Sequence, residues 1–151
     1  MKVHFKLANK DDLQEILDMM EDFNAIDQYD FNRKTGSDNI LEFINNEVLG
    51  RLWLIMDNHN IIGYIALTFG FSFEYQGKDA FIDELYLKKS FRNKGIGNTT
   101  MDFVIDQAKK LRVRAIHLEV ERHNESGNSL YTKHGFKGNQ RNLLTKILSG
   151  S

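Results

Sequence analysis

The chain has 151 residues, of which 41% are hydrophobic and 27% are charged, and this length suits one domain around one hydrophobic core. Its formal net charge is -1 at pH 7, which argues against a general nucleic-acid binder. The absence of cysteine excludes disulfides and cysteine-type zinc sites and fits a reducing compartment.

The N-terminal residues lack the apolar core of a signal peptide, and no segment approaches the roughly 18 apolar residues that a membrane span needs. The five histidines show none of the spacings typical of a metal site. We therefore expect a cytoplasmic protein with no membrane partner, no nucleic-acid partner and no bound metal. We expect the domain to cover residues 1–148, with residues 149–151 as an artificial tail.

The first half of the chain has the pattern of a strand, two helices and a hairpin. Asn9 can cap the first helix, and Ser37 or Asp38 can open the second, because short polar side chains accept hydrogen bonds from the free N–H groups of a helix start. The polar stretch between these helices predicts no regular structure. The predicted ranges are a strand at 3–7, a helix from Asn9 through Phe23, an irregular segment at 27–36, a helix ending near Gly50, and strands at 52–56 and 61–71.

In the second half, strands alternate with helices. A turn at 75–78 precedes the first of these strands. The predicted ranges are a strand at 80–87, a helix at 96–111, a strand at 115–120, a helix at 126–134 and a last strand at 142–148. The full order is β-α-α-β-β-β-α-β-α-β, with no repeat or linker, which predicts a single domain of the α/β (mixed α+β) class.

The strongest functional signal is the turn at residues 91–97, Phe-Arg-Asn-Lys-Gly-Ile-Gly, which joins a predicted strand to a predicted helix. Free N–H groups and the positive end of a helix dipole attract an anion, and glycine lets that anion approach because no Cβ is in the way. Arg92 and Lys94 add positive charge beside these groups. The turn indicates a phosphate site, although a plain helix start remains open from the turn alone.

Two motifs and the element order resemble the Gcn5-related N-acetyltransferase (GNAT) family, which binds acetyl-CoA and passes the acetyl group to an amine. Residues 92–97 fit the phosphate-binding pattern Q/R-x-x-G-x-G/A. A second pattern, N-x-x-A-x-x-L-Y-x-x-x-G-F, is matched by Asn124, Leu130, Tyr131, Gly135 and Phe136. Gly127 stands where the family usually has alanine. The resemblance covers nearly the whole chain and implies a mostly antiparallel central sheet with helices on both faces.

The resemblance also implies that the cofactor is acetyl-CoA. Its pantetheine arm is expected to run beside the strand at 80–87, and its pyrophosphate is expected to lie on the turn that follows. The cofactor-binding residues implied in this way are Leu85, Tyr86, Leu87, Arg92, Asn93, Lys94, Gly95, Ile96, Gly97, Asn98, Asn124 and Tyr131.

Acetyl transfer to an amine needs a base for the protonated amine and an acid for the departing thiolate. The resemblance implies Tyr131 as the acid, and simple packing of this tyrosine is the alternative. Asp83 and Glu84 are the candidates for the base. In a regular strand they face opposite sides unless a bulge intervenes, so the choice between them stays open, as does a plain ion pair with a basic side chain.

Acidic residues are concentrated between Lys10 and Asp30, and the resemblance implies that this region borders the acceptor groove. We expect Asp27, Tyr29 and Asp30 to contact the acceptor, a small-molecule primary amine, cationic or polyamine-like. For the acids of the first helix, a solvated surface is the better interpretation. A peptide or protein N-acetyltransferase and a non-catalytic acyl-CoA-binding sensor remain alternatives, and a homodimer remains open.

Overall fold

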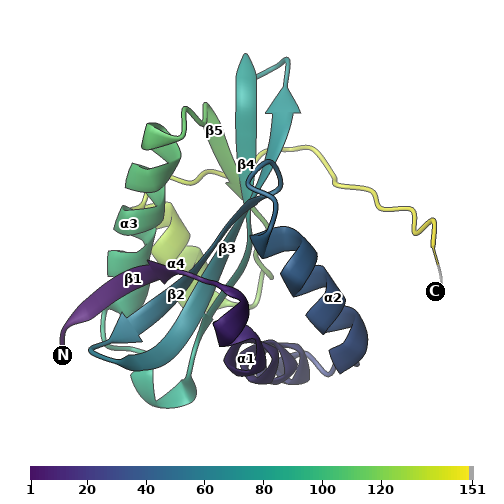
Figure 1. Ribbon diagram of the computed structural model, residues 1–151. Coiled ribbons are helices and arrows are strands. Elements are labelled where there is room, and N and C mark those ends of the chain that lie inside the picture. The colour runs from purple at the N-terminus through teal and green to yellow at the C-terminus, as the bar shows by residue number, and fades with distance from the viewer. Residues whose placement is uncertain (150–151) are drawn as a thin grey trace.

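A computed structural model describes residues 1–149, which form one mixed α/β domain (Figure 1). The strands are β1 (Val3–Leu7), β2 (Gly50–Asp57), β3 (Asn60–Ser72), β4 (Gly77–Leu87) and β5 (Ala115–Leu118). The α-helices are α1 (Leu13–Ile26), α2 (Arg33–Ile44), α3 (Ile96–Lys110) and α4 (Glu125–Lys133). Short 3-10 helices, η1 (Lys10–Asp12) and η2 (Lys89–Phe91), precede α1 and the turn before α3.

The central sheet has the strand order β1-β2-β3-β4-β5, with antiparallel neighbours except for the parallel pair β4 and β5. Strands β4 and β5 pair from Asp79 opposite Ala115 to Ile82 opposite Leu118. Beyond Ile82, β4 stays paired with β3 alone. The last residues of β4 therefore have one edge that no strand covers within residues 1–149, and this edge borders the large cleft described below.

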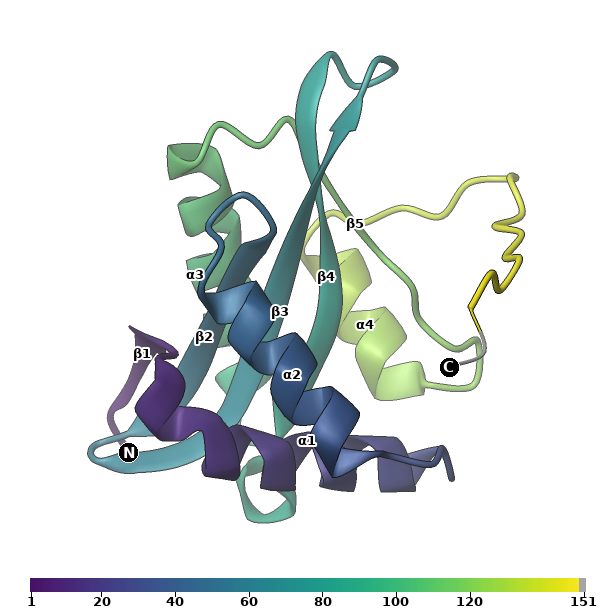
Figure 2. The same ribbon diagram turned by 45° about the vertical axis from the view of Figure 1, so that its right-hand side comes forward.

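Helices cover both faces of the sheet, as Figures 1 and 2 show. On one face α1 and α2 contribute Ile16 and Ile40, which pack with Leu54. On the other face α3 contributes Val104, which packs with Trp53. Neighbouring residues of β2 thus point to opposite layers, as the alternation of a strand requires. Complete burial of an aliphatic side chain stabilises the folded state by about 1.5–3 kcal/mol.

Helix α2 begins at Arg33 and ends at Ile44, whereas the sequence predicts a start at Ser37 or Asp38 and an end near Gly50. The Asn32 side chain accepts a hydrogen bond from Thr35 N at 3.0 Å and caps this earlier start. The helix continues through Gly36, whose missing side chain lets Phe31 approach: a Cβ there would lie 2.6 Å from the ring. Tertiary packing outweighs the low helix propensity of glycine, which is why the prediction was wrong at this boundary.

The predicted last strand at 142–148 is wrong. Residues 137–149 have no helix or strand, and the last of these residues extend away from the body of the domain (Figures 1 and 2). Their alternating apolar side chains suit a strand, but a strand also needs a neighbour for its N–H and C=O groups, and the structure gives residues 142–148 none. The observed order of the other nine elements follows the prediction.

Within residues 1–149, no helix combines the length and apolar character needed to cross a membrane. The same residues hold no group of three or more histidine, cysteine or acidic side chains that could bind a metal ion.

Candidate active site

A β-bulge at Asp83 interrupts the pairing of β3 with β4. Ala66 lies opposite Glu84, whereas the next residue, Leu67, lies opposite Ile82. Asp83 is therefore the extra residue on β4, without a partner of its own on β3. Bulges of this kind bend a strand and redirect its side chains, and they occur often beside active sites.

The bulge changes which face the side chains of β4 occupy. Before it, Ala80 and Ile82 pack in the core cluster on the α3 side of the sheet. After it, Tyr86 packs in the core cluster on the α1 and α2 side. The result is that Asp83 and Glu84 line the same cavity of about 340 Å³, enclosed by α1, α2 and the sheet. We call this the acidic cavity.

Glu84 is the better placed of the two acids to act as a base. Its carboxylate accepts a 2.7 Å hydrogen bond from the hydroxyl of Tyr64, a fully buried residue of β3. Burial raises the pKa of Glu84, the nearby charge of Asp83 raises that pKa too, and the Tyr64 hydrogen bond acts against both. Burial also raises the pKa of Tyr64 strongly, so its hydroxyl remains a donor. Asp83 is exposed.

Tyr86 connects β4 to α1 on the same face. Its hydroxyl donates a hydrogen bond to Asp22, and burial, followed by this bond, raises the pKa of Tyr86 to about 12. The rings of Phe23, Tyr64 and Tyr86 form a stacked and tilted cluster with centroids 5.7 to 6.5 Å apart. This cluster fixes the position of α1 over the end of β4.

A cavity with a volume of about 730 Å³, which we call the large cleft, lies between the uncovered end of β4, the end of α1 and the starts of α3 and α4. The residues that line it are Phe23, Ile26, Asp27, Leu85, Tyr86, Leu87, Arg92, Gly97, Glu121, His123, Asn124, Glu125, Ser126 and Leu130. Consecutive residues of β4 belong to different cavities, since Glu84 lines the acidic cavity and Leu85 the large cleft.

The turn into α3 has the backbone form of an anion site. Gly95, the N-cap residue, has φ 79°, and Asn93 has φ 62°, so the chain takes two left-handed positions before the helix. No side chain caps the helix start, which leaves the first N–H groups of α3 without a capping acceptor. A Cβ on Gly97 would lie 3.2 Å from Leu130 and would narrow the cleft. These features fit a phosphate group.

Arg92 is held in place beside this turn. Its Nε donates a 2.8 Å hydrogen bond to the carbonyl oxygen of Leu87, and its guanidinium carbon lies 5.5 Å from the centroid of the Tyr86 ring. The bond to Leu87 uses Nε, and a guanidinium group binds an anion through its terminal nitrogens. The Arg92 side chain thus connects the end of β4 with the turn that precedes α3.

Half of the predicted cofactor residues line the large cleft. They are Leu85, Tyr86, Leu87, Arg92, Gly97 and Asn124. Asn93, Lys94 and Gly95 are exposed on the turn, and Ile96 is buried under it. Asn98 is engaged elsewhere, because its Oδ1 lies 3.1 Å from Nε2 of His134.

Asn124 is the N-cap of α4, and its Oδ1 accepts a 3.0 Å hydrogen bond from Gly127 N. A Cβ on Gly127 would lie 2.5 Å from the Asn124 side chain. Gly127, which stands where the family usually has alanine, therefore leaves room for the Asn124 side chain in its capping position. The cap in turn orients the start of α4, which lines the large cleft.

Tyr131 does not line the large cleft, although its neighbour Leu130 does. It lines a cavity of about 390 Å³ along β5, which we call the β5 cavity, and its ring makes an edge contact with Phe136 at 6.1 Å. Burial raises the pKa of Tyr131. The structure thus brings Asp83 and Glu84 together but places Tyr131 in another cavity.

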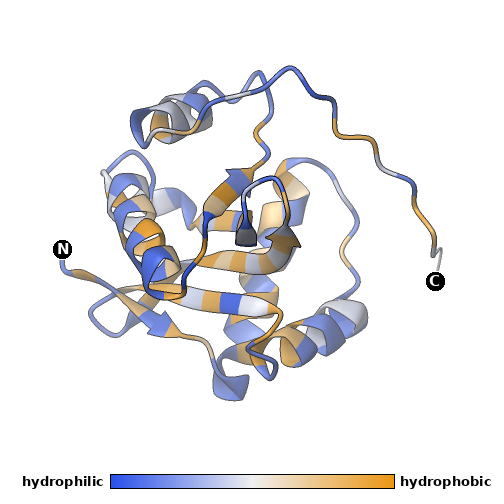
Figure 3. Cartoon of the chain, turned by 90° about the horizontal axis from the view of Figure 1, so that it is seen from above, coloured by the Kyte–Doolittle hydropathy of each residue, from blue (hydrophilic) through white to orange (hydrophobic). Residues whose placement is uncertain are grey.

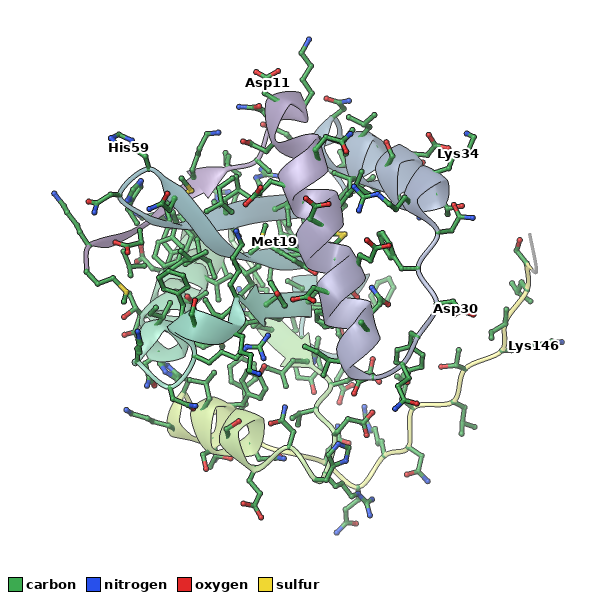
Figure 4. The ribbon with its side chains drawn as sticks, turned by 90° about the horizontal axis from the view of Figure 1, so that it is seen from below. Asp11, Met19, Asp30, Lys34, His59 and Lys146 are labelled. Atoms are coloured by element: carbon green, nitrogen blue, oxygen red, sulfur yellow. The ribbon has the colours of Figure 1, made fainter. Side chains whose placement is uncertain are left out.

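The residues predicted to contact the acceptor also lie in different places. Asp27 lines the large cleft. Tyr29 is 65% exposed, and Asp30 lies on the outer side of the loop between α1 and α2 (Figure 4). Neither Tyr29 nor Asp30 lines any of the three cavities named above.

Several acids of the N-terminal region form ion pairs. Arg33 Nη1 lies 3.0 Å from Asp18 and 3.1 Å from Glu21, and Lys88 Nζ lies 2.7 Å from Glu15. These groups are partly exposed, and such pairs typically contribute less than about 1 kcal/mol. Their charges are compensated locally, as expected for a surface helix.

The sequence analysis did not name Tyr64, Asp22 or the neighbours of Asn124 that line the large cleft, which are Glu121, His123, Glu125 and Ser126. A signal for Tyr64 exists: a tyrosine within an apolar strand needs a partner for its hydroxyl. No such signal marks the residues between β5 and α4, which line the large cleft only because β5 diverges from β4 after Leu118.

The acetyltransferase (GNAT) family model matches residues 16–136, which is most of the chain. The chain belongs to this family. Members of the GNAT family use acetyl-CoA, and acetyl-CoA is accordingly the cofactor of this domain. The match includes both ends of β4, the turn at residues 91–97 and α4.

Solved structures agree with the GNAT fold. An integron cassette protein from the mobile metagenome of Cole Harbour Salt Marsh has a TM-score of 0.87 and 27% identity, over 97% of this chain and 91% of that one. A possible acetyltransferase from Clostridium difficile 630 has a TM-score of 0.86 and 17% identity, over 99% of both chains. A protein from Clostridium acetobutylicum, described as a predicted acetyltransferase with acetyl-CoA, has a TM-score of 0.81 and 19% identity, over 96% of both.

Proposed function

We propose that the protein transfers the acetyl group of acetyl-CoA to a primary amine of a small molecule, and that this amine carries a further positive charge, as in a polyamine. The observation behind the proposal is the bulge that brings Asp83 and Glu84 to one cavity. That cavity shares β4 and α1 with the cofactor cleft. An amine in the acidic cavity would thus lie beside the cofactor.

The lining of the acidic cavity supports an acceptor with a cationic end and an aliphatic body. Asp83 and Glu84 provide negative charge on one wall, and Phe31, Ile40 and Phe43 provide apolar surface on the others. Negative charge in a partly enclosed space raises the local concentration of cations. Apolar walls favour methylene groups in contact with them.

In the proposed reaction, two residues carry out the proton transfers. Acetyl-CoA supplies a thioester whose carbonyl carbon forms the new bond to the amine nitrogen while its bond to sulfur breaks. Glu84, whose pKa burial raises, takes the proton that the amine must lose. Tyr131 is proposed to give a proton to the departing thiolate, and its raised pKa keeps it protonated near neutral pH.

The cofactor is proposed to bind in an extended form along β4. Leu85, Tyr86 and Leu87 offer backbone groups on the edge that β5 leaves uncovered, so an amide-containing arm can pair with them like an added strand. Its pyrophosphate would then meet Arg92 and the first N–H groups of α3. The cytoplasmic location stays a prediction from the sequence.

The test is a turnover assay with acetyl-CoA and a panel of acceptors, with free thiol release as the readout. The panel contains polyamines, single-charge alkylamines of equal length, amino acids, aminoglycosides and peptides. We expect the highest kcat/KM with amines that carry a second charge, and a decrease of kcat/KM with added salt. Turnover restricted to neutral, anionic or peptide acceptors would contradict the proposal.

A further inference from the structure

Tyr64 reaches Glu84 along a diagonal of the paired strands β3 and β4. Tyr64 itself lies opposite Tyr86, whereas Ala66 lies opposite Glu84. Diagonal neighbours in a sheet are about 7–8 Å apart, and aromatic or other long side chains can span this gap. Ala66 carries only a methyl group, so the space beside it is open to a longer neighbour. The Tyr64 hydroxyl crosses this space and lies 2.7 Å from Oε1 of Glu84.

The Tyr64 side chain is held firmly. It is fully buried in the core cluster on the α1 and α2 side of the sheet. Its ring stacks with Tyr86 and with Phe23 of α1, at centroid distances of 5.7 and 6.5 Å. Hydrophobic residues predominate along the central strands (Figure 3), and within residues 1–149 the Tyr64 hydroxyl hydrogen-bonds to Glu84 alone. The position of this hydroxyl is therefore fixed by packing.

The two carboxylate oxygens of Glu84 have different surroundings. Oε1 accepts the hydrogen bond from Tyr64, whereas Oε2 has no hydrogen-bond partner in the part of the chain that the structure describes. Glu84 lines the acidic cavity, and Tyr64 does not. Burial raises the pKa of Tyr64 strongly, so the hydroxyl keeps its proton and continues to donate it to Oε1. A proton that Glu84 takes up accordingly binds to Oε2.

We propose that Tyr64 is a positioning residue for acetyl transfer: it holds Oε1 of Glu84 and thereby presents Oε2 to the acceptor amine. This inference rests on the proposed function, in which Glu84 is the base. The ammonium group of the acceptor gives one proton to Oε2, which leaves a neutral amine and a neutral carboxylic acid. The overall reaction converts one ammonium ion and one thioester into an amide, a thiol and one released proton. Because Tyr64 is buried, the proton on Oε2 leaves through the acidic cavity.

The same hydrogen bond determines the pH range in which Glu84 can act. Among the residues that line the acidic cavity, from both helices and both strands, only Asp83 and Glu84 carry charge. Burial and the charge of Asp83 raise the pKa of Glu84, and the Tyr64 hydrogen bond lowers it. Phenylalanine at position 64 would keep the ring and lose only the hydroxyl. Glu84 would then stay protonated, and unable to act as a base, up to a higher pH.

The first test compares the pH dependence of kcat for the wild type and Tyr64→Phe, with Tyr75→Phe as a control that also loses one hydroxyl. In Tyr64→Phe, the pH of half-maximal activity on the acidic side should rise by about one to two pH units, as expected for a lost hydrogen bond to a charged group. Below this pH, kcat should be about tenfold to a hundredfold lower than in the wild type, and at higher pH the two should converge. KM for acetyl-CoA should not change, because Tyr64 does not line the large cleft. An unchanged pH of half-maximal activity would overturn the proposal.

The second test separates positioning from packing by making Tyr64→Phe in the Glu84→Gln background. If Tyr64 acts through the carboxylate, loss of its hydroxyl should lower kcat no further once that carboxylate is gone. An equal loss of kcat in both backgrounds would mean a purely structural role and would refute the positioning role. The proposed function fails in a different way: Glu84→Gln itself would then keep the kcat of the wild type, and Glu84 would not be the base.

A third variant keeps the inference testable even if Tyr64→Phe does not fold. 3-Fluorotyrosine at position 64 retains the ring and the hydroxyl, and fluorine makes that hydroxyl a stronger hydrogen-bond donor. The pH of half-maximal activity should then move downward, opposite to its movement in Tyr64→Phe. Titration of the Glu84 carboxyl carbon by NMR should show the same direction without any turnover. No movement, or an upward one, would contradict the role of Tyr64.

Discussion

Tyr64 of β3 donates a 2.7 Å hydrogen bond to Glu84 of β4, so the proposed base is held by a neighbouring strand of the same sheet. The bond is possible because the bulge at Asp83 moves Glu84 to the face of the sheet that Tyr64 occupies. A carboxylate held in this way has a fixed orientation toward the acidic cavity. Its charge is stabilised by one strong donor and opposed by burial.

Replacement of Glu84 by glutamine should lower kcat near neutral pH by about 10²- to 10⁴-fold, the usual loss for a positioned base. The loss should shrink at high pH, where the amine is already neutral. In the wild type, activity should fall as the pH decreases through the raised pKa of Glu84, and the variant should not show this decrease. Asp83→Asn is the matched control. An equal loss in both variants would contradict the assignment of Glu84.

The same substitution, which lowers activity, should raise the stability of the protein. Because the folded-state pKa of Glu84 lies above its ordinary value of 4.5, burial of the charged form weakens the fold as the pH rises through that folded pKa. Glutamine keeps an acceptor for Tyr64 and carries no charge. The difference between the melting temperatures of Glu84→Gln and the wild type should therefore grow in favour of the variant as the pH rises from 4.5 through the raised pKa of Glu84. A constant difference across this range would show that Glu84 is not destabilised by its charge.

Gly97→Glu should abolish the rise in melting temperature that acetyl-CoA produces. Saturation at a hundredfold excess over Kd stabilises a native state by about 2.7 kcal/mol. A carboxylate at position 97 would crowd Leu130 and repel phosphate beside Arg92. Gln107→Glu adds the same charge about 15 Å further along α3 and should keep the shift. A shift retained in Gly97→Glu would place the cofactor elsewhere.

Tyr131→Phe should lower kcat by about tenfold to a thousandfold while the affinity for acetyl-CoA stays unchanged. The reason is that the substitution removes only a hydroxyl, and Tyr131 lies outside the lining of the large cleft. Tyr75→Phe changes another tyrosine of the β5 cavity and serves as the control. Steady-state kinetics with calorimetry of cofactor binding separates the two effects. Unchanged turnover would make Tyr131 a packing residue.

Gly127→Ala should not stabilise the protein, although alanine is favoured over glycine in a helix by up to about 1 kcal/mol. The added methyl group would displace the Asn124 cap, which typically contributes about 0.5–2 kcal/mol. In the Asn124→Ala background that conflict is absent, and the alanine should then be stabilising. Chemical denaturation of the wild type, the two single variants and the double variant gives the coupling free energy between positions 124 and 127. A stabilising effect in the wild-type background would refute the conflict.

The conformation of the turn at residues 91–97 could be predicted because its signal is local. Residues 92–97 alone determine the glycine positions, the positive charges and the helix start, and the structure shows all of these in one place. The two base candidates could be named from the sequence but not separated. Their separation depends on the pairing of Glu84 with Ala66 and on Tyr64, which lies 20 residues away along the chain.

The features that escaped prediction depend on distant partners. The start of α2 depends on how Phe31 packs over Gly36, and the environment of Tyr131 depends on how far β5 stays paired with β4. The pattern at 142–148 was strand-like, and the prediction failed because no partner strand is present in the same chain. The periodicity of a segment predicts which face of a sheet each side chain occupies, whereas strand pairing also depends on a second segment.

The bulge at Asp83 also determines how this strand can change its length in evolution. Deletion of Asp83 would place Glu84 directly after Ile82, and the ladder with Ala66 and Leu67 would then be regular, so Glu84 and Tyr86 would keep their face of the sheet. Deletion of one residue after the bulge, such as Leu85, would instead move either Glu84 or Tyr86 to the opposite face. Deletion of Asp83 should therefore be tolerated better than deletion of Leu85, and the melting temperatures of the two variants would show the difference.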